Sequence, residues 1–346
     1  MKNKTHLVFG AGLTGGYLAG GLISAGLSTS LVAREKTRKA MSGGLFLSDY
    51  QGNQKTLPAP KFATDGNPLK QSFDFIWLTV KCTAIANITS DLAPFVSDSS
   101  VIICCQNGFG SDQTIRQSFP NNDVLIAIVG FNVAEPKPGH LHRSTEGRLV
   151  IQQTGETHST SSEAMPWLAD KLNSKMLPAL TSEHIEAEQW AKLQLNLTNP
   201  INAIANIPLK RMLEDRGFRK IVACLMEELL ALCAAKDIKL PQINVVPGHW
   251  IPRVMKLPNF IFNVVGKNMI DIDPTARLSM WWDLNNGKAT EITFINGALV
   301  AAGKEVGLAC PANEAVVKLI QKIESTGKQL TLNSTELRNI IQTTNA

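Results

Sequence analysis

The sequence predicts an α/β domain with a mainly parallel sheet, followed by an all-α domain. The chain has 346 residues, which is too long for one ordinary hydrophobic core, so two domains are expected. In the first half, short β-rich apolar runs alternate with helical stretches, as in parallel βαβ units. From about Ile185 onward, apolar residues recur at helical spacing. We place the two domains at residues 1–182 and 183–346.

In the first half, strands are expected where a β-rich apolar run ends in polar residues or glycine. These runs are residues 5–9, 29–33, 73–80, 101–105 and 124–129, with further strands expected at 149–152 and 176–180. A helix of small residues is expected over 17–25, between the first two runs, and Gly26 stops it.

The second half is expected to be mainly α-helical, with frequent prolines between the helices. Helices are expected at residues 190–195, 218–235, 273–299 and 313–323. In the helix expected at 218–235, Ile221, Leu225, Leu229 and Leu232 form an apolar stripe at helical spacing. The last twenty residues are rich in Thr, Asn and Gln, and we expect one more helix or a frayed tail there.

Composition and charge exclude several classes of protein. The chain is 44% hydrophobic and 18% charged, which is typical of globular proteins. It has no run near the roughly 18–20 apolar residues of a membrane span, and Gly10 and Gly12 interrupt its N-terminal apolar run, unlike a signal peptide. The net charge of +5 is mild and its basic residues are scattered. We therefore expect a cytoplasmic protein with no membrane or nucleic-acid partner.

Cysteine and histidine spacing does not predict a metal site. The six cysteines form no Cys-x-x-Cys pair, so buried, reduced thiols are expected. His140 and His142 form a His-x-His pair, but no third ligand follows at a recognisable spacing. No metal is expected.

The strongest local motif is a glycine-rich turn, Gly10-Ala11-Gly12-Leu13-Thr14-Gly15, directly after the first expected strand. In a Gly-x-Gly-x-x-Gly turn the first glycine permits a tight turn, the second lets a pyrophosphate approach the backbone, and the third lets helix and strand pack. The following helix N-terminus supplies unpaired N–H groups for phosphates. We interpret the turn as a dinucleotide-binding loop.

The end of the second strand indicates which dinucleotide binds. An NAD site usually has an acidic residue there, about 20 residues beyond the glycines, which accepts from the ribose 2′-hydroxyl. Here Arg34 follows the strand, and a guanidinium pairs with a 2′-phosphate. The residue after it is Glu35, which could serve NAD instead. We expect NADP(H), with NAD as the alternative.

Taken together, these features resemble the ketopantoate reductase (2-dehydropantoate 2-reductase) family, from about Leu7 to Ile323. The resemblance rests on five blocks in the family's order. They are Gly10–Gly15 with Arg34, Leu78-Thr79-Val80-Lys81, Gln106-Asn107-Gly108-Phe109-Gly110, Trp190-Ala191-Lys192-Leu193-Gln194-Leu195-Asn196, and Ser279-Met280-Trp281-Trp282-Asp283 leading to Thr290-Glu291-Ile292-Thr293-Phe294-Ile295-Asn296-Gly297. Each block is modest alone, but five spread over both domains are specific.

The resemblance implies a Rossmann domain, a helical domain and an active site in the cleft between them. It also implies NADPH-dependent reduction of a 2-oxo acid, ketopantoate to pantoate, on the route to pantothenate and coenzyme A. By similarity, Lys192 matches the catalytic lysine, and Glu291 matches the glutamate that holds substrate and nicotinamide ribose. The other matched positions are Asn107 beside nicotinamide and substrate, Lys81 on the cofactor side, and the substrate-binding Asn196 and Ser279.

The chemistry of these residues agrees with that assignment. Hydride addition to a ketone builds negative charge on the carbonyl oxygen, which a nearby ammonium stabilises and then protonates. Lys192 lies in an apolar helical context, where we expect burial to lower the pKa of its ammonium. Lys192 and Asn196 are four residues apart, hence on one helix face. Glu291 is expected on the helix after the one that begins near Ser279.

Departures from the family pattern concern the substrate side. Trp282 stands where the family often has Gln, and Thr293 where it often has Asp. Beyond the lysine helix the asparagine turn is one residue tighter, so either Asn199 or Asn202 could fill the second substrate position. The alternatives are a paralogue that reduces another 2-oxo acid and a dinucleotide-binding sensor without turnover. A homodimer through the helical domain is left open.

Overall fold

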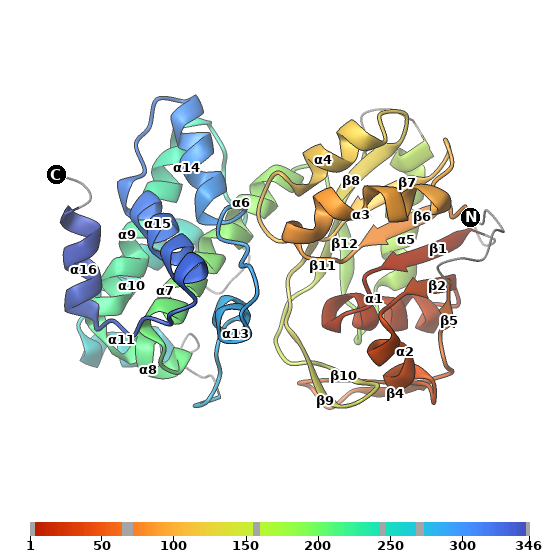
Figure 1. Cartoon of the computed structure of the whole chain (residues 1–346), viewed down its shortest axis with the longest axis horizontal. Helices are drawn as coiled ribbons and strands as arrows, with labels where there is room; N and C mark the ends of the chain where they lie inside the picture. The colour runs from red at the N-terminus through yellow and green to blue at the C-terminus, as the bar shows by residue number, and fades with distance from the viewer. Residues whose placement is uncertain (1–3, 64–71, 155–159, 243–245, 268–272, 344–346) are drawn as a thin grey trace. The chain divides into compact units, whose positions relative to one another are not determined.

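The computed structural model describes residues 4–63, 72–154, 160–242, 246–267 and 273–343. The chain divides into two compact units, whose elements are labelled in Figure 1. The first unit comprises Met1–Gln106 and Gly110–Ile185, and the second comprises Asn107–Phe109 and Glu186–Ala346. Three residues from the first half of the chain therefore belong with the helical second unit.

Among the described residues of the first unit, eight strands form one sheet that is mainly parallel, as predicted. In spatial order they are β12 (Ala179–Ser182), β11 (Leu149–Gln152), β8 (Asp123–Val129), β7 (Val101–Cys104), β6 (Phe75–Leu78), β1 (Thr5–Phe9), β2 (Ser28–Val32) and β5 (Lys61–Phe62). Among these strands β8 and β11 form the antiparallel pair. The strand expected at 176–180 begins later, at Ala179, because Pro178 precedes it.

Helices cover both faces of this sheet, and alternation along the strands assigns each side chain to a face. Leu7 and Phe9 of β1 pack with α3 (Ile85–Leu92) and α4 (Ser111–Ser118). Val8, between them, packs with α1 (Leu13–Ser24) and α5 (Thr160–Leu172) on the opposite face. Both faces are therefore buried, which is why these strands read as nearly continuous apolar runs.

A second sheet in the first unit is absent from the sequence-based expectation. It has four strands in the order β4 (Gln54–Leu57), β3 (Leu45–Asp49), β10 (His140–Arg143) and β9 (Val133–Lys137). Helix α1 contacts the strands of both sheets, so it is buried on all sides (Figure 1). A Cβ on Gly16 would lie 2.7 Å from Leu141, and one on Gly20 would lie 2.8 Å from Leu47. The small residues of this helix are explained by its position between two sheets.

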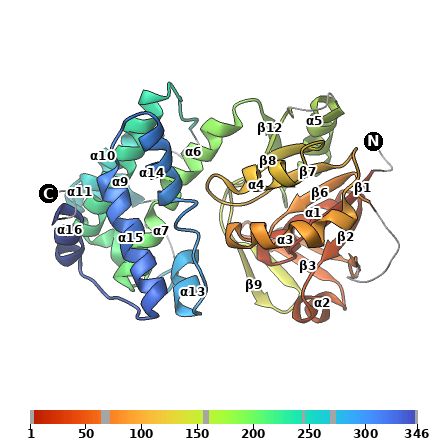
Figure 2. The same ribbon diagram turned by 45° about the horizontal axis from the view of Figure 1, so that its top comes forward.

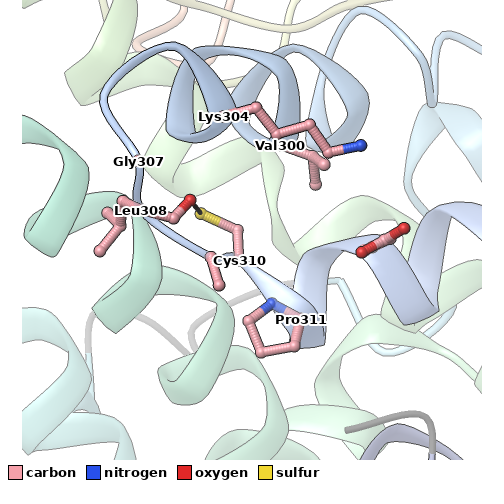
Figure 3. Close-up of a pocket in the computed structure, with 8 residues that line it drawn as sticks. Val300, Lys304, Gly307, Leu308, Cys310 and Pro311 are labelled. Carbon is pink, nitrogen blue, oxygen red and sulfur yellow. Dashed lines mark hydrogen bonds between the residues drawn. The ribbon is translucent and has the colours of Figure 1, made fainter.

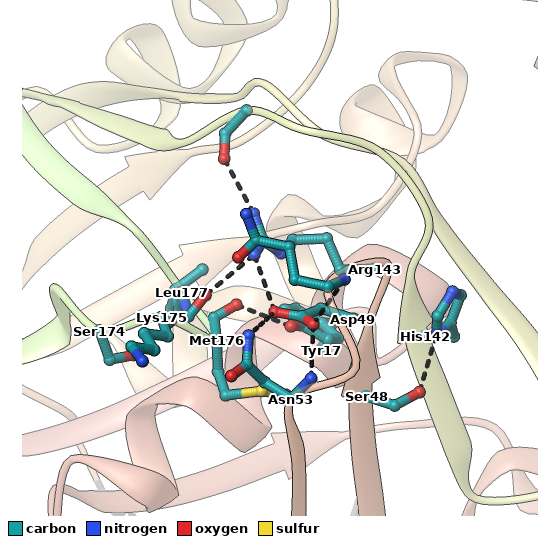
Figure 4. A network of polar contacts seen from close by, with 12 residues as sticks. Tyr17, Ser48, Asp49, Asn53, His142, Arg143, Ser174, Lys175, Met176 and Leu177 are labelled. Atoms are coloured by element: carbon teal, nitrogen blue, oxygen red, sulfur yellow. Dashed lines mark hydrogen bonds and ion pairs between the residues drawn. The ribbon is translucent and has the colours of Figure 1, made fainter. Parts of the chain in front are cut away.

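A buried ion pair joins the ends of the neighbouring strands β3 and β10 in this second sheet (Figure 4). Arg143 and Asp49, 2% and 0% exposed at their side chains, are joined at 3.1 Å. Arg143 also donates to the carbonyls of Gly147 and Lys175, so it links β10 to the segment before β12. Burial raises the pKa of Asp49, but hydrogen bonds from Asn53, Arg143 and a backbone N–H together hold it below its usual value.

The described part of the second unit is helical and contains no strand. Its helices are α6 (Ile185–Asn196), α7 (Thr198–Ala205), α8 (Leu209–Glu214), α9 (Arg216–Ala235), α10 (Ile251–Lys256), α11 (Asn259–Val265), α13 (Ser279–Asn285), α14 (Asn296–Glu305), α15 (Pro311–Thr326) and α16 (Ser334–Thr343). The helix α9 carries the predicted stripe from Ile221 to Leu232 into the core and contacts α10, α14, α15 and α16 (Figure 2). For the C-terminal residues, one more helix or a frayed tail was expected, and the structure shows a helix, α16, over Ser334–Thr343.

The helix expected over 273–299 is wrong in part. Residues 273–278 are not helical, α13 covers seven residues, and a turn separates it from α14. Gly287, with φ of 61°, lies just past α13 in the left-handed region that ends many helices. In the first unit, the short helix α2 (Glu35–Met41) follows β2. Among the described residues, no helix is long and apolar enough to cross a membrane.

Candidate active site

The glycine motif forms the turn between β1 and α1. Gly10 has φ of 103°, a conformation that favours glycine. The N–H groups of Gly10 and Ala11 both donate to the carbonyl of Val32 at 3.1 Å, and the Thr79 hydroxyl donates to the carbonyl of Gly10 at 2.8 Å. The turn is thereby fixed to the carboxyl ends of both neighbours of β1, the position where open α/β sheets bind ligands.

The surroundings of the three glycines fit a dinucleotide loop. A Cβ on Gly10 would lie 2.6 Å from Val80, and one on Gly15 would collide with the Thr79 hydroxyl. A Cβ on Gly12 would have no atom within 4 Å. The turn is therefore packed against the protein at the first and third glycines and open at the second, where a pyrophosphate would approach the backbone.

Arg34 and Lys81 lie at the same edge of the sheet as this loop. Arg34 is the residue before α2, two positions past the end of β2, and its side chain is exposed. Lys81 follows β6 and is also exposed. Glu35, the residue that would favour NAD, lies 3.6 Å from Lys39 in an exposed ion pair. The structure therefore presents a cation at each side of the glycine turn.

The other predicted residues belong to the second unit, where the segment Asn107–Phe109 is docked by three contacts. Phe109 donates its N–H to the carbonyl of Phe294 at 3.0 Å. Its ring lies 4.2 Å from that of Trp190, measured between centroids. The carbonyl of Gly108 accepts from Gln189 at 3.3 Å. Gly108 itself has φ of 77° and leaves no room for a Cβ against the Phe294 carbonyl.

This docking brings Asn107 to Glu291. The Nδ2 of Asn107 donates to Oε2 of Glu291 at 3.4 Å, across 184 positions of sequence. Glu291 is 9% exposed. The expectation that Glu291 lies on a helix is wrong, because it lies in the turn before α14. Its carbonyl accepts from the N–H groups of Phe294 and Ile295, and these two hydrogen bonds form the turn. The turn thus presents Glu291 from outside a regular element.

The preceding residue holds this turn in place. Thr290 is 3% exposed, and its backbone N–H donates to a carboxylate oxygen of Glu324 at 2.6 Å. Its hydroxyl accepts from the N–H of Ile292 at 3.2 Å. Sequence reasoning missed Glu324, because nothing in the local pattern of α15 distinguishes it from a surface acid. It also missed the docking role of Gly108, for which the only sequence signal is a turn after a strand.

Helix α6 presents Lys192 and Asn196 on the face that meets the docked segment. Gln189, Lys192 and Asn196 are spaced at three and four residues, which places them on one helix face. Gln189 on that face donates to Gly108, next to the Asn107–Glu291 pair. The Nδ2 of Asn196 is buried and has no hydrogen-bond partner among the described residues. A buried amide donor of this kind favours an acceptor from a ligand.

The remaining predicted residues lie around the start of α13. Ser279, its first residue, is exposed. Asn202 is fully buried, and its amide is used at both ends: Oδ1 accepts from the N–H of Leu278 at 3.0 Å, and Nδ2 donates to the carbonyl of Ile207 at 2.9 Å. Asn202 therefore fixes the residue before Ser279. Asn199 lies one turn away on α7 and is 8% exposed.

The cysteines are free thiols, and five of them are buried, whereas Cys224 is exposed. Cys310 lies in a small pocket with Val300, Lys304 and Pro311 (Figure 3). Burial raises the pKa of its thiol to about 11. Within the described parts of the chain, no group of three potential metal-binding side chains occurs.

The first unit is an α/β domain with a glycine-rich turn at the carboxyl ends of its parallel strands, and the second is a helical domain that carries Lys192, Glu291 and several asparagines. These features are typical of dinucleotide-dependent oxidoreductases. Comparison with known proteins agrees. The sequence matches the family described as "Ketopantoate reductase PanE/ApbA" over residues 6–156 and its C-terminal domain over residues 184–324. The chain belongs to the ketopantoate reductase family and is an oxidoreductase of that family.

Individual relatives cover nearly the whole chain at low identity. It is 25% identical to the 2-dehydropantoate 2-reductase of Archaeoglobus fulgidus over 327 residues, 94% of this chain and 99% of that one. It is similar to the crystal structure of a PanE/ApbA family ketopantoate reductase from Ralstonia eutropha, with a TM-score of 0.74, 26% identity, and 93% and 99% coverage. A D-mandelate dehydrogenase structure with NADH and anilino(oxo)acetate shares the fold, with a TM-score of 0.75, 21% identity, and 93% and 99% coverage.

Proposed function

We propose that this protein reduces the ketone of a 2-oxo acid with NADPH, and that the substrate is 2-dehydropantoate (ketopantoate), reduced to pantoate for pantothenate and coenzyme A biosynthesis. The observation that carries the proposal is the Asn107–Glu291 hydrogen bond. This bond joins the block that contains Asn107 to the block that contains Glu291. Both lie next to the face of α6 that carries Lys192, the residue of a third block. Family membership supports the reaction class.

In this proposal the first domain, residues 1–182, holds the cofactor. The backbone of Gly10, Ala11, Gly12, Leu13, Thr14 and Gly15 would receive the pyrophosphate. Arg34 would pair with the 2′-phosphate, which distinguishes NADP from NAD, and Lys81 would add a second cation at that edge. Asn107 and Glu291 would contact the nicotinamide end. The expected position of the site between the domains, a cytoplasmic location and a homodimer stay predictions.

The residues of the second domain, 183–346, do the remaining chemistry. NADPH, when bound, supplies the hydride that adds to the carbonyl carbon. The Lys192 ammonium would stabilise the charge that develops on the carbonyl oxygen and give that oxygen its proton from Nζ. Asn196 would donate a hydrogen bond from its unpartnered Nδ2 to the same oxygen. Glu291, oriented by Asn107, would accept from a hydroxyl of the substrate or the ribose.

The substrate would also contact Ser279 and Asn199. Asn202, whose amide is occupied by Leu278 and Ile207, enters the proposal as the residue that holds the start of α13.

A second candidate function is that of a paralogue that reduces another branched or aromatic 2-oxo acid. Trp282 favours it, because this large ring, 53% exposed, stands where the family often has Gln. An apolar wall discriminates less against other substrates than a site that hydrogen-bonds a hydroxyl.

The test is NADPH oxidation by the purified full chain with ketopantoate, other branched 2-oxo acids, phenylpyruvate and oxaloacetate. Rapid turnover confined to ketopantoate would support the proposal, and turnover of another acid would support the paralogue. If no acid of the panel is reduced although NADPH binds, both candidates are overturned in favour of a dinucleotide-binding sensor.

Lys192→Ala is expected to lower turnover by about 10²-fold or more while NADPH binding stays nearly intact. Lys318→Ala, on an exposed helix face, is the matched control.

The cofactor is tested separately. Arg34→Ala is expected to weaken NADPH binding far more than NADH binding, because only NADPH carries the 2′-phosphate. Arg148→Ala, an exposed arginine on a loop of the same unit, should change neither dissociation constant. Equal losses for the two cofactors in Arg34→Ala would remove the case for NADP.

A further inference from the structure

The segment before α13 carries an arginine that none of the matched blocks includes. Arg277 lies two residues before Ser279, and its guanidinium carbon stands 4.1 Å from the centroid of the Trp281 ring. The Trp281 ring is itself fixed, because its Nε1 donates to Oδ1 of Asn206 at 2.7 Å. The guanidinium therefore rests on an aromatic surface that is anchored to the end of α7.

The backbone around Arg277 is held equally firmly. Leu278 donates its N–H to the side chain of Asn202 at 3.0 Å, and the carbonyl of Ala276 accepts from Leu209 at 2.8 Å. Both neighbours of Arg277 are thus tied to α7 and the start of α8. An arginine held by its backbone and by its stacking surface is preorganised, so little conformational entropy is lost when it binds.

The charge of this arginine is not matched within the described chain. Nη1 of Arg277 is buried and has no hydrogen-bond partner among the described residues. The nearest acid in sequence, Asp273, uses Oδ1 to accept from the N–H and hydroxyl of Thr275. A buried guanidinium N–H without an acceptor is costly, and its planar donors match the oxygens of a carboxylate. The arrangement calls for an anionic ligand.

We propose that Arg277 binds the carboxylate of the 2-oxo acid and is a specificity-determining residue of the substrate site. The inference rests on the proposed function, which places the substrate beside Ser279. Arg277 selects acids over uncharged ketones, esters and amides, and it orients the ketone by holding the adjacent carboxylate. Hydride and proton transfer remain with the groups described above.

The experiment compares wild type with Arg277→Gln and Arg277→Met in two assays. In steady-state reduction of the best 2-oxo acid of the panel, each variant is expected to raise KM by at least about tenfold, the scale of a lost charge-assisted hydrogen bond. The methyl ester of the same acid should show the same KM in wild type and variants. Arg253→Gln is the matched control, because Arg253 also stacks on a tryptophan, at 4.6 Å, but is exposed; its KM should not change.

Equilibrium binding separates this inference from the proposed function. Oxamate, an unreactive isostere of a 2-oxo acid, and oxamide, its uncharged analogue, are titrated calorimetrically into wild type and both variants with NADPH present. Tighter binding of oxamate than of oxamide in wild type, lost in both variants, supports the inference even if no acid of the panel is reduced. Equal binding of oxamate by wild type and Arg277→Met, or no binding of oxamate by wild type, overturns it even if reduction of a 2-oxo acid is established.

Thermal unfolding without ligand excludes a merely structural role. Methionine keeps the apolar contact with Trp281 but removes the unmatched charge, so the Tm of Arg277→Met should equal or exceed that of wild type. A fall in Tm together with unchanged oxamate binding would show that the arginine only packs against the ring.

Discussion

We expect His6 to make the stability of the first unit depend on pH. It lies on β1, four residues before Gly10, and is fully buried. Its Nδ1 accepts from Nε1 of Trp77 at 3.3 Å, its ring stacks on Phe75, and its Nε2 is buried without a hydrogen-bond partner in the described chain. Burial lowers the pKa of His6 from 6.5 to about 4, although Asp74 acts in the opposite direction.

The sign and size of the effect follow from linkage. The unfolded chain binds a proton at His6 below pH 6.5, whereas the folded chain resists it until about pH 4, so stability falls as pH drops through this window. A pKa lowered from 6.5 to about 4 corresponds to at most about 3.4 kcal/mol, at about 1.36 kcal/mol per pH unit. Between pH 7 and pH 5 the expected loss from His6 is about 2 kcal/mol.

The perturbation is His6→Gln, which keeps an acceptor for Trp77 but does not titrate. Urea unfolding of the full chain, followed by circular dichroism at pH 7 and pH 5, should show a free energy of unfolding that falls by about 2 kcal/mol less in the variant than in wild type. His184→Gln, which removes an exposed imidazole, should leave the pH dependence unchanged. An equal pH dependence in His6→Gln and wild type, or an NMR titration of His6 near pH 6.5, would refute the reasoning.

Two further predictions concern contacts described above. Gly108→Ala is expected to lower kcat by about 10²-fold, because a Cβ there displaces the docked segment and with it Asn107. Steady-state kinetics and an NADPH titration should show a loss of turnover larger than the loss of cofactor affinity, and unchanged kcat would contradict the prediction. Arg143→Met leaves Asp49 buried without its partner and should destabilise the chain by about 3–5 kcal/mol in urea unfolding. A loss below about 1 kcal/mol would mean that the ion pair contributes little.

The parts of the fold that were predictable are those encoded by local patterns. The strand at Thr5–Phe9 and the glycine turn after it follow from a buried apolar run and a required left-handed residue. In the four-stranded sheet, which was missed, β9 and β10 lack that signal: four of the five residues of β9 are exposed, and β10 alternates histidines with Leu141 and Arg143. Its stability comes from packing against α1, which no local pattern records.

In the candidate site too, residues in a local motif were predictable from the sequence, whereas contacts between distant residues were not. The glycine loop was predicted from the spacing of its glycines together with their position between an expected strand and an expected helix, since the tight turn and the phosphate contact need those residues in sequence order. Asn107 and Glu291 were each named only through resemblance to a family, and their hydrogen bond was not predicted, because no periodicity relates residues 184 positions apart. Asn202 was predicted to face the substrate as an alternative to Asn199, but sequence cannot show that a backbone N–H and a carbonyl already occupy its amide.

The placement of Asn107–Phe109 in the helical unit has a consequence for biosynthesis. A chain made from its N-terminus releases this segment long before Trp190 and Phe294, its docking partners, have been synthesised. The amide and carboxylate can therefore meet only after most of the polypeptide has left the ribosome, and closing so long a loop is slow compared with forming local contacts. Any nascent or truncated product that ends before Glu291 lacks the pair altogether, even if its first unit has folded. The covalent continuity of the chain thus makes formation of the Asn107–Glu291 pair one of the last steps of its assembly.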